Sequence, residues 1–150
     1  MEGTTADLPL SARVRPFIEV NERCAASHLT AAELHRLPQR RDNDSLEAYH
    51  LIRPEDAAHL DRPHVIVHRM KLYSDEVTTV DGIPVTTPER TWLDMAETLT
   101  LDELVVMRDS CVRVPREFSG NAAPAGHGAG WVAGTRAERS PHFGGRDTAP

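Results

Sequence analysis

The sequence predicts a small α+β domain with an N-terminal helix, a mostly antiparallel sheet and a C-terminal helix pair, followed by a disordered tail. Three observations support this fold class. An apolar helical pattern ends at Pro38, short β-rich runs occupy the middle of the chain, and two capped helical patterns begin near Pro88. With 150 residues and 39% hydrophobic content, the chain is long enough for one modest core.

The first helix is expected to end before Pro38, and Thr30 and Glu33 have the spacing of a capping box within it. The runs that follow alternate in polarity or are rich in β-branched residues, and Asp81-Gly82 has the composition of a two-residue hairpin turn. Strands are therefore expected at 48–52, 65–70, 77–80 and 83–85, with a short helix or turn at 54–60.

The C-terminal helix pair carries clear local signals. Thr87 stands at an N-cap position and Pro88 at the first helical position, where its missing N–H costs nothing. Thr100 and Glu103 have the spacing of a capping box that opens a second helix. The helix that begins at Pro88 is expected to bury one apolar stripe, made of Trp92, Leu93, Ala96 and Leu99.

Composition divides the chain into three parts: a flexible leader at 1–22, an α+β domain at 23–116 and a disordered tail at 117–150. The tail holds seven of the nine glycines and contains no Leu, Ile, Met or Lys, so it has few apolar groups to offset the entropy of ordering. Its Gly/Ala/Arg-rich mixture is typical of a GC-rich gene read in a shifted frame, and we treat a frameshift as a hypothesis.

Charge and composition also narrow the classes of function. The net charge is −6 and Lys71 is the one lysine, which disfavours DNA binding by this chain alone, since duplex binding depends on cationic side chains. No apolar run reaches the roughly 18 residues that a membrane helix needs. Together with the absence of a secretory leader pattern, this predicts a soluble, cytoplasmic protein in which Cys24 and Cys111 are reduced.

Three segments resemble a known family. The run TTPERTWLDMA at 86–96 resembles the T-S-P-x-R-T-x-x-D-L-A signature of actinobacterial proteins similar to AbiEi-type antitoxins. SHLTAAEL at 27–34 resembles the family's S-H-x-T-A-A-x-L helix, and VIVHR at 65–69 resembles its V-x-V-H-R strand. The resemblance covers roughly 24–115 and implies the middle domain of a type IV toxin–antitoxin regulator, without the operator-binding winged helix that precedes it in the family.

By this resemblance the chain is expected to be a non-catalytic protein-binding domain that masks a cognate nucleotidyltransferase-type toxin. The expected contact surface is the helix pair at 88–112 with the adjoining sheet. Because some relatives end in a Vsr-like endonuclease domain, a truncated, inactive remnant of such a protein is the alternative. A DNA-binding regulator is a third possibility, which the acidic charge disfavours.

Four residues are candidates for partner binding: Thr87, Arg90, Asp94 and Arg108. The Arg90 guanidinium, fixed by a carboxylate four residues on, would suit toxin recognition, but a structural pair that orients the helix corner is favoured.

Several histidines invite a chemical interpretation. His50, His64 and His68 could meet on neighbouring strands and hold zinc, yet surface histidines are favoured because no further ligand has a recognised spacing. His28 beside Ser27 is interpreted as a helix start, since no acidic residue is placed to orient the imidazole. No catalytic residue, cofactor or metal is therefore expected.

Overall fold

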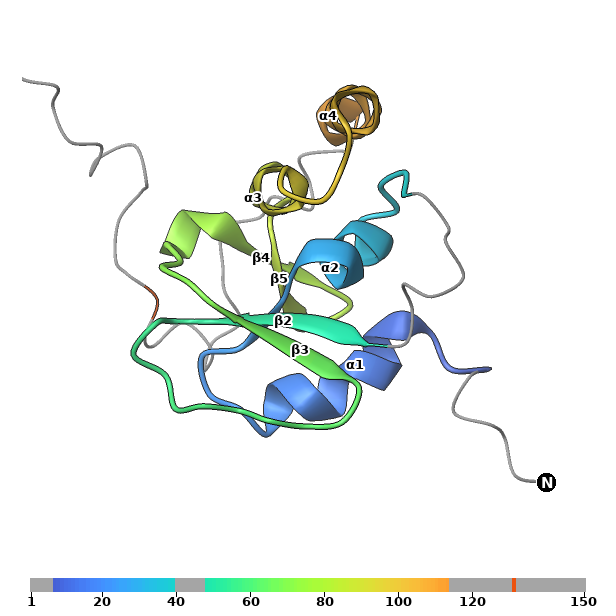
Figure 1. Ribbon diagram of the computed structural model, residues 1–150. Coiled ribbons are helices and arrows are strands. Elements are labelled where there is room, and N and C mark those ends of the chain that lie inside the picture. The colour runs from blue at the N-terminus through green and yellow to red at the C-terminus, as the bar shows by residue number, and fades with distance from the viewer. Residues whose placement is uncertain (1–6, 40–47, 114–130, 132–150) are drawn as a thin grey trace, which may run out of the picture.

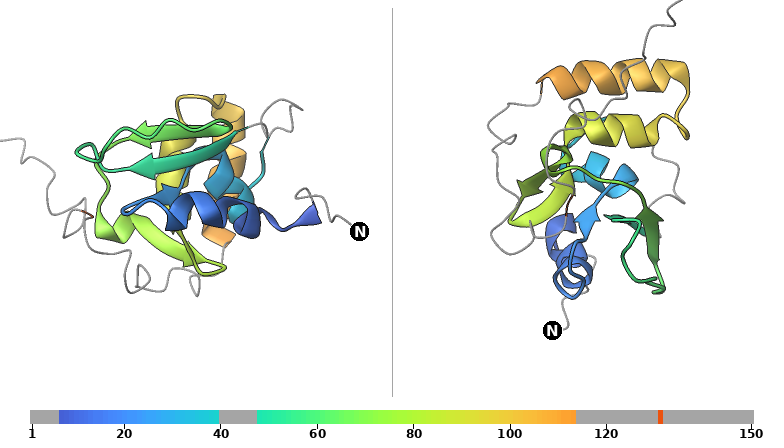
Figure 2. Two further views of the ribbon diagram at one scale, coloured as in Figure 1. Left: turned by 90° about the horizontal axis from the view of Figure 1, so that it is seen from below. Right: turned by 90° about the vertical axis from the view of Figure 1, so that its left-hand side faces the viewer.

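The computed structural model describes residues 7–39, 48–113 and 131. These residues form an α+β domain, as the sequence predicts (Figure 1). Five strands make one sheet in the order β3-β2-β1-β5-β4, with α1 on one side, and α2, α3 and α4 stack outward on the other (Figure 2). The helices are α1 (Leu10–Glu19), α2 (His28–Leu34), α3 (Pro88–Met95) and α4 (Leu101–Arg113). The strands are β1 (Ala25–Ala26), β2 (Tyr49–Arg53), β3 (Val65–Arg69), β4 (Val77–Val80) and β5 (Ile83–Thr86), with a 3₁₀ turn, η2, at Ser74–Glu76.

The sheet is mixed, whereas the sequence suggested a mostly antiparallel one. β1 with β2 and β4 with β5 run antiparallel, but β2 with β3 and β1 with β5 run parallel. The connection 54–64 carries the chain back along β2 before β3 begins, and a return of this kind is what a parallel neighbour requires. The direction of β3 thus depends on the path of this connection, which the pattern of polar and apolar residues in the strands does not reveal.

The segment expected to be a flexible leader contains α1, so that expectation is wrong for residues 10–19. Val14 and Ile18 lie four residues apart on one helix face, and both are fully buried against the sheet. Pro16 lies inside the helix on its exposed side, where the ring does not interrupt packing. The sequence prediction missed this short amphipathic helix because Pro16 and the surrounding charged residues interrupt its apolar pattern.

Local signals predicted the turns and the starts of the C-terminal helices correctly. The expected apolar stripe of the first of these helices is wrong in part, because Leu93 and Ala96 are exposed and the buried face of α3 carries Arg90, Asp94 and Met95 instead. The Asp81-Gly82 turn joins β4 to β5, and both residues have the positive φ (49° and 78°) that a tight hairpin requires. Thr87 Oγ1 accepts a hydrogen bond from the backbone N–H of Arg90 (3.2 Å), which confirms the N-cap. The predicted capping box of α4 is also present, with Thr100 N donating to Glu103 Oε2 at 2.8 Å.

The expected capping box at Thr30 and Glu33 is absent. The N-cap of α2 is Ser27, and Thr30 Oγ1 instead accepts a hydrogen bond from the backbone N–H of His50 (2.8 Å). This bond links α2 to β2. α2 begins only at His28, because residues 25–26 form β1 in the centre of the sheet.

Most of the predicted tail at 117–150 lies outside the described residues, so the frameshift hypothesis is not tested. Trp131 is described, and it is only 6% exposed. Its side chain packs in a cluster with Ala25, Ile52, Leu72 and Val77. At this position the expectation of a disordered tail is wrong.

Among the described residues, no helix has both the length and the apolar character needed to cross a membrane. Cys24 and Cys111 are free thiols. Burial is the main cause that raises the pKa of Cys24 to about 12 and that of Cys111 to about 11, so both thiols stay protonated near neutral pH.

Candidate functional site

A buried ion cluster lies beneath α3. Arg90 Nε donates to Asp94 Oδ1 and Arg90 Nη1 donates to Glu76 Oε2, both at 2.8 Å. Glu76 Oε2 also accepts the backbone N–H of Tyr73 at 3.0 Å. Burial opposes the charge of Arg90, but the neighbouring carboxylates of Asp94 and Glu76 outweigh it and raise its pKa. The cluster joins α3 to η2 and so sets where the helix sits on the sheet.

The structure separates the four candidate residues into two groups. Arg90 and Asp94 form the pair expected from their spacing, and their side chains are only 4% and 2% exposed. Thr87 is half-buried and caps α3. Arg108 is exposed on α4. Contact of any of the four with a partner stays a prediction, but only Arg108 presents its side chain openly to solvent.

α4 has an unusual balance of buried and exposed apolar residues. Met107 is its one buried side chain, while Leu101, Val105 and Val112 are 76%, 51% and 80% exposed. These three residues and Arg108 are spaced i, i+4, i+7 and i+11, which places them in one line along the helix. We call this line, made of Leu101, Val105, Arg108 and Val112, the α4 stripe.

α4 forms the outermost layer of the helix stack and is held firmly (Figure 2). Trp92 Nε1 of α3 donates a hydrogen bond to the backbone carbonyl of Leu104 at 2.8 Å. Met107 packs with Met95 and Ala32, with the half-buried Leu99 and Cys111 alongside. The α4 stripe is therefore presented by a helix whose other face is already anchored.

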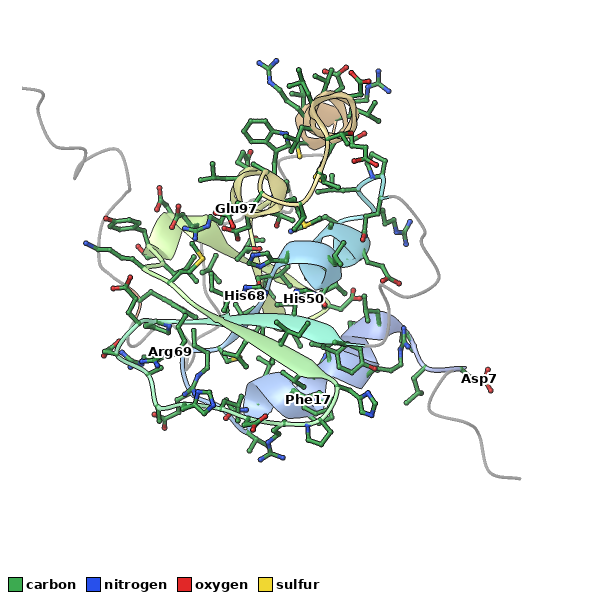
Figure 3. All side chains as sticks on the ribbon, viewed as in Figure 1. Asp7, Phe17, His50, His68, Arg69 and Glu97 are labelled. Atoms are coloured by element: carbon green, nitrogen blue, oxygen red, sulfur yellow. The ribbon has the colours of Figure 1, made fainter. Side chains whose placement is uncertain are left out.

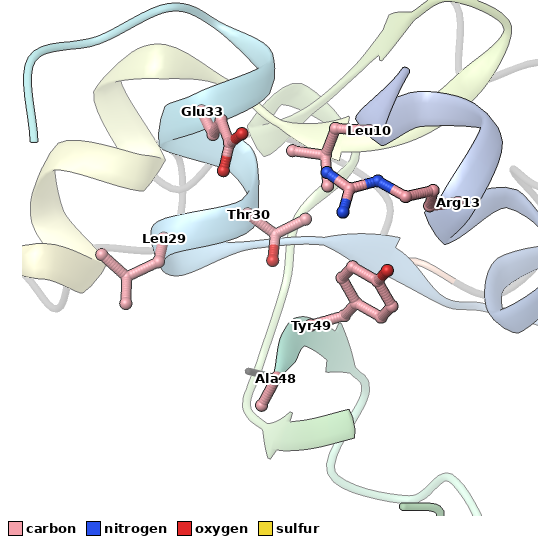
Figure 4. Close-up of a pocket in the computed structure, with 7 residues that line it drawn as sticks. All are labelled: Leu10, Arg13, Leu29, Thr30, Glu33, Ala48 and Tyr49. Carbon is pink, nitrogen blue, oxygen red and sulfur yellow. The ribbon is translucent and has the colours of Figure 1, made fainter. Parts of the chain in front are cut away.

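An open depression of about 550 Å³ lies beside α3. Both members of the Arg90–Asp94 pair line it. Its lining also includes His28, Glu55, Met70, Lys71, Tyr73, Leu93, Ala96 and Glu97. A second pocket, between α1, α2 and β2, encloses only about 10 Å³, the room for roughly one water molecule (Figure 4).

Three histidines meet next to the depression. They are His28 at the start of α2, His50 on β2 and His68 on β3, and their ligand-type nitrogens all lie within 4.8 Å of one another. His50 Nδ1 lies 3.0 Å from His68 Nε2, and the rings of His28 and His68 stack with centroids 3.5 Å apart. Figure 3 shows His50 and His68 below Glu97 of the α3 end. We call this group the histidine cluster.

The cluster differs from the trio considered from the sequence. His64 is exposed and lies outside it, and His28 takes its place. β2 and β3 pair in parallel with Ile52 opposite His68, so His50 and His68 share a face, and α2 brings His28 over that face. Sequence spacing could not reveal a contact that depends on the packing of a helix across two strands.

Burial is the main influence on the imidazoles of the histidine cluster. It lowers the pKa of His28 to about 3 and that of His50 to about 4, with the neighbouring histidines adding to the effect. Burial also lowers the pKa of His68, although the carboxylate of Glu97 opposes the shift. All three rings are therefore neutral near pH 7, which leaves each with one nitrogen lone pair.

The elements from β1 to α4 make up a small α+β domain that carries an outward helix pair. A family model for the AbiEi antitoxin C-terminal domain matches residues 24–109, which include all of these elements except the end of α4. The chain belongs to the AbiEi antitoxin family, and this membership supports an antitoxin role in a toxin–antitoxin system. No curated protein matches the chain. The helix α1, which completes one side of the sheet, lies outside the matched segment.

Proposed function

We propose that this chain acts as an antitoxin by binding its cognate toxin, a nucleotidyltransferase-type protein, without catalysing a reaction itself. The observation that carries the proposal is the α4 stripe, a mostly apolar line on a helix that packs against the domain through another face. The family membership supports the class of partner.

The exposed apolar side chains of the α4 stripe favour burial against a protein surface. Moving a Leu or Val side chain fully out of water contributes about 1.5–3 kcal/mol, and contiguous exposed apolar residues commonly mark protein contacts. Arg108 lies within the stripe, and arginine is enriched among residues that contribute most to protein binding. A toxin surface with an apolar groove and an acidic group would complement this pattern.

The buried ion cluster supports the same proposal indirectly. Arg90 and Asp94 hold α3 on the sheet, Thr87 caps it, and Trp92 of α3 bonds to α4. A helix held in place before binding loses less entropy when the complex forms. Three of the four candidate residues thus act as positioning residues beneath the surface, and Arg108 acts at the surface.

The test is co-expression of the chain with the product of the adjacent gene, read by tagged pull-down and by rescue of growth. V105E and R108E place the wrong charge on the α4 stripe, and V106E and R113E are matched controls on exposed α4 positions outside it. We expect V105E and R108E to abolish capture and rescue, and the controls to retain both.

Two results would contradict the proposal. If the wild-type chain neither captures the toxin nor rescues growth, it is not an antitoxin for that protein. If capture persists in V105E and R108E, the antitoxin role stands but the α4 stripe is not the contact surface.

A further inference from the structure

The histidine cluster brings together three imidazoles from three separate elements. His28 comes from the N-terminus of α2, His50 from the second strand of the sheet and His68 from the edge strand β3. The sequence around each histidine does not predict that the three side chains meet. Imidazole nitrogen is a preferred ligand of zinc and related divalent ions, and three histidines with one open position form a recurrent zinc ligand set.

The backbone holds His28 in an uncommon conformation to reach this position. Its φ of 48° lies in the left-handed region, which non-glycine residues occupy rarely and which histidine tolerates better than most. Ser27 Oγ lies 3.0 Å from His28 Nδ1 and is fully buried. A polar group bound to one ring nitrogen fixes the orientation of the ring and leaves Nε2 as the ligand atom, as partners of metal-bound histidines do.

We propose that His28, His50 and His68 bind a zinc-type divalent metal ion at the wall of the depression beside α3. Tetrahedral zinc with Zn–N bonds of about 2.0–2.1 Å places its ligand nitrogens roughly 3.3 Å apart. The cluster nitrogens lie within 4.8 Å, so a small contraction brings them into range. Because the rings of His28 and His68 are only 14° from parallel, they must turn toward a common point as the ion enters.

Metal binding also requires the hydrogen shared between His50 and His68 to move to another nitrogen. In the hydrogen bond between His50 Nδ1 and His68 Nε2, one nitrogen carries the hydrogen and the other accepts it. When the ion takes both lone pairs, the donor ring changes tautomer and carries its hydrogen on its other nitrogen. Both rings remain neutral.

The surroundings leave room for an ion to enter and for a fourth ligand. His28 lines the open depression, and Glu97, exposed at the end of α3, lines it too. The fourth position would therefore face solvent and hold a water molecule or the Glu97 carboxylate. β3 pairs only with β2 within the described sheet, so an ion shared with α2 would fasten this edge strand.

The test uses the full chain without an affinity tag, titrated with ZnCl₂ by isothermal calorimetry near pH 7.5. We expect one ion per chain and a higher melting temperature with zinc, because an ion that binds only the folded state stabilises it. H50N and H68N should weaken binding by more than about tenfold, since even partners of metal ligands change affinity by about 10- to 100-fold. E97Q tests the identity of the fourth ligand: weaker zinc binding would identify the Glu97 carboxylate, and unchanged binding would identify water.

Two sets of controls address the other histidines. H59N changes an exposed histidine away from the cluster. The double variant H127N/H142N changes two that lie outside the described residues. Both should bind zinc as the wild type does. Loss of binding in either control, with H50N and H68N unaffected, would move the site elsewhere and overturn the proposal.

A measurement on the wild-type chain decides the question if H50N or H68N fails to fold. In a ¹⁵N-histidine NMR spectrum, one equivalent of zinc should shift the ring nitrogens of His28, His50 and His68 and leave the other five histidines unchanged. Cobalt(II) should give the intense visible absorption of a tetrahedral site. No zinc binding, or shifts confined to other histidines, refutes the site. None of these readouts depends on the toxin, so antitoxin function and metal binding can fail separately.

Discussion

Arg90 places a positive charge in the interior of the domain, where its side chain is 4% exposed. A buried charge is tolerated only with partners, and Asp94 and Glu76 supply them from α3 and from η2. Both acids bind Arg90, and Glu76 also accepts the backbone N–H of Tyr73. Sequence spacing revealed half of this arrangement. The i, i+4 pair was visible, but Glu76 lies fourteen residues away from Arg90 and its role depends on the fold.

Replacing Arg90 tests whether its role is internal. R90A leaves two carboxylates buried without their shared guanidinium, and loss of one partner of a buried ion pair typically costs about 3–5 kcal/mol. We expect a loss of this size in the free energy of unfolding, measured by urea titration. R108A, which changes an exposed arginine on α4, should stay within about 0.5 kcal/mol of the wild type. Equal changes in the free energy of unfolding in the two variants would contradict a structural role for Arg90.

At the scale of secondary structure, the elements that were predicted well carry their signals in a few adjacent residues. The Asp81-Gly82 turn, the Thr87 cap and the Thr100–Glu103 box all depend on contacts within four positions of the chain. The elements that were missed depend on distant partners. β1 is two residues long and exists because β2 and β5 flank it, and the direction of β3 follows from its connection.

The same distinction explains the candidate sites. The exposed apolar residues of α4 could be placed on a helix from the sequence, but which of its faces packs on α3 required the fold. The histidine cluster needed the parallel register of β2 and β3 and the position of α2 above them. Residues 10–19 have a helical pattern, but Pro16 and the flanking charges led to the prediction of a flexible leader.

The contribution of α1 can be measured with one buried apolar residue in the helix and one exposed apolar residue just after its end. Ile18 is fully buried against the sheet and Val20, two positions on, is 68% exposed. I18A should lower the free energy of unfolding by about 2–5 kcal/mol, because it removes core contacts and leaves a cavity. V20A should change it by less than about 0.5 kcal/mol. If I18A is as mild as V20A, residues 10–19 do not belong to the folded unit.

At the scale of the whole molecule, the described residues form three apolar clusters that hold the layers together. One joins α1 to the sheet, and another joins α2, α3 and α4. The third lies where Ile52 of β2 and Val77 of β4 meet Leu72, and Trp131 completes it. A residue far beyond α4 in sequence therefore closes part of the core, outside the segment that the antitoxin family model matches.

Trp131 provides a direct test of whether the C-terminal sequence contributes to the fold. Its indole Nε1 is buried without a hydrogen-bond partner among the described residues, so the ring contributes through apolar contacts alone. W131A should cost about 3–5 kcal/mol of unfolding free energy, whereas W131F keeps an aromatic ring, relieves the buried N–H and should cost less than about 1.5 kcal/mol. Urea titration of both variants measures this difference. A C-terminal sequence produced by a shifted reading frame has no reason to supply a core residue, so wild-type stability in W131A would favour the frameshift, and a large loss would argue that the tail evolved with the domain.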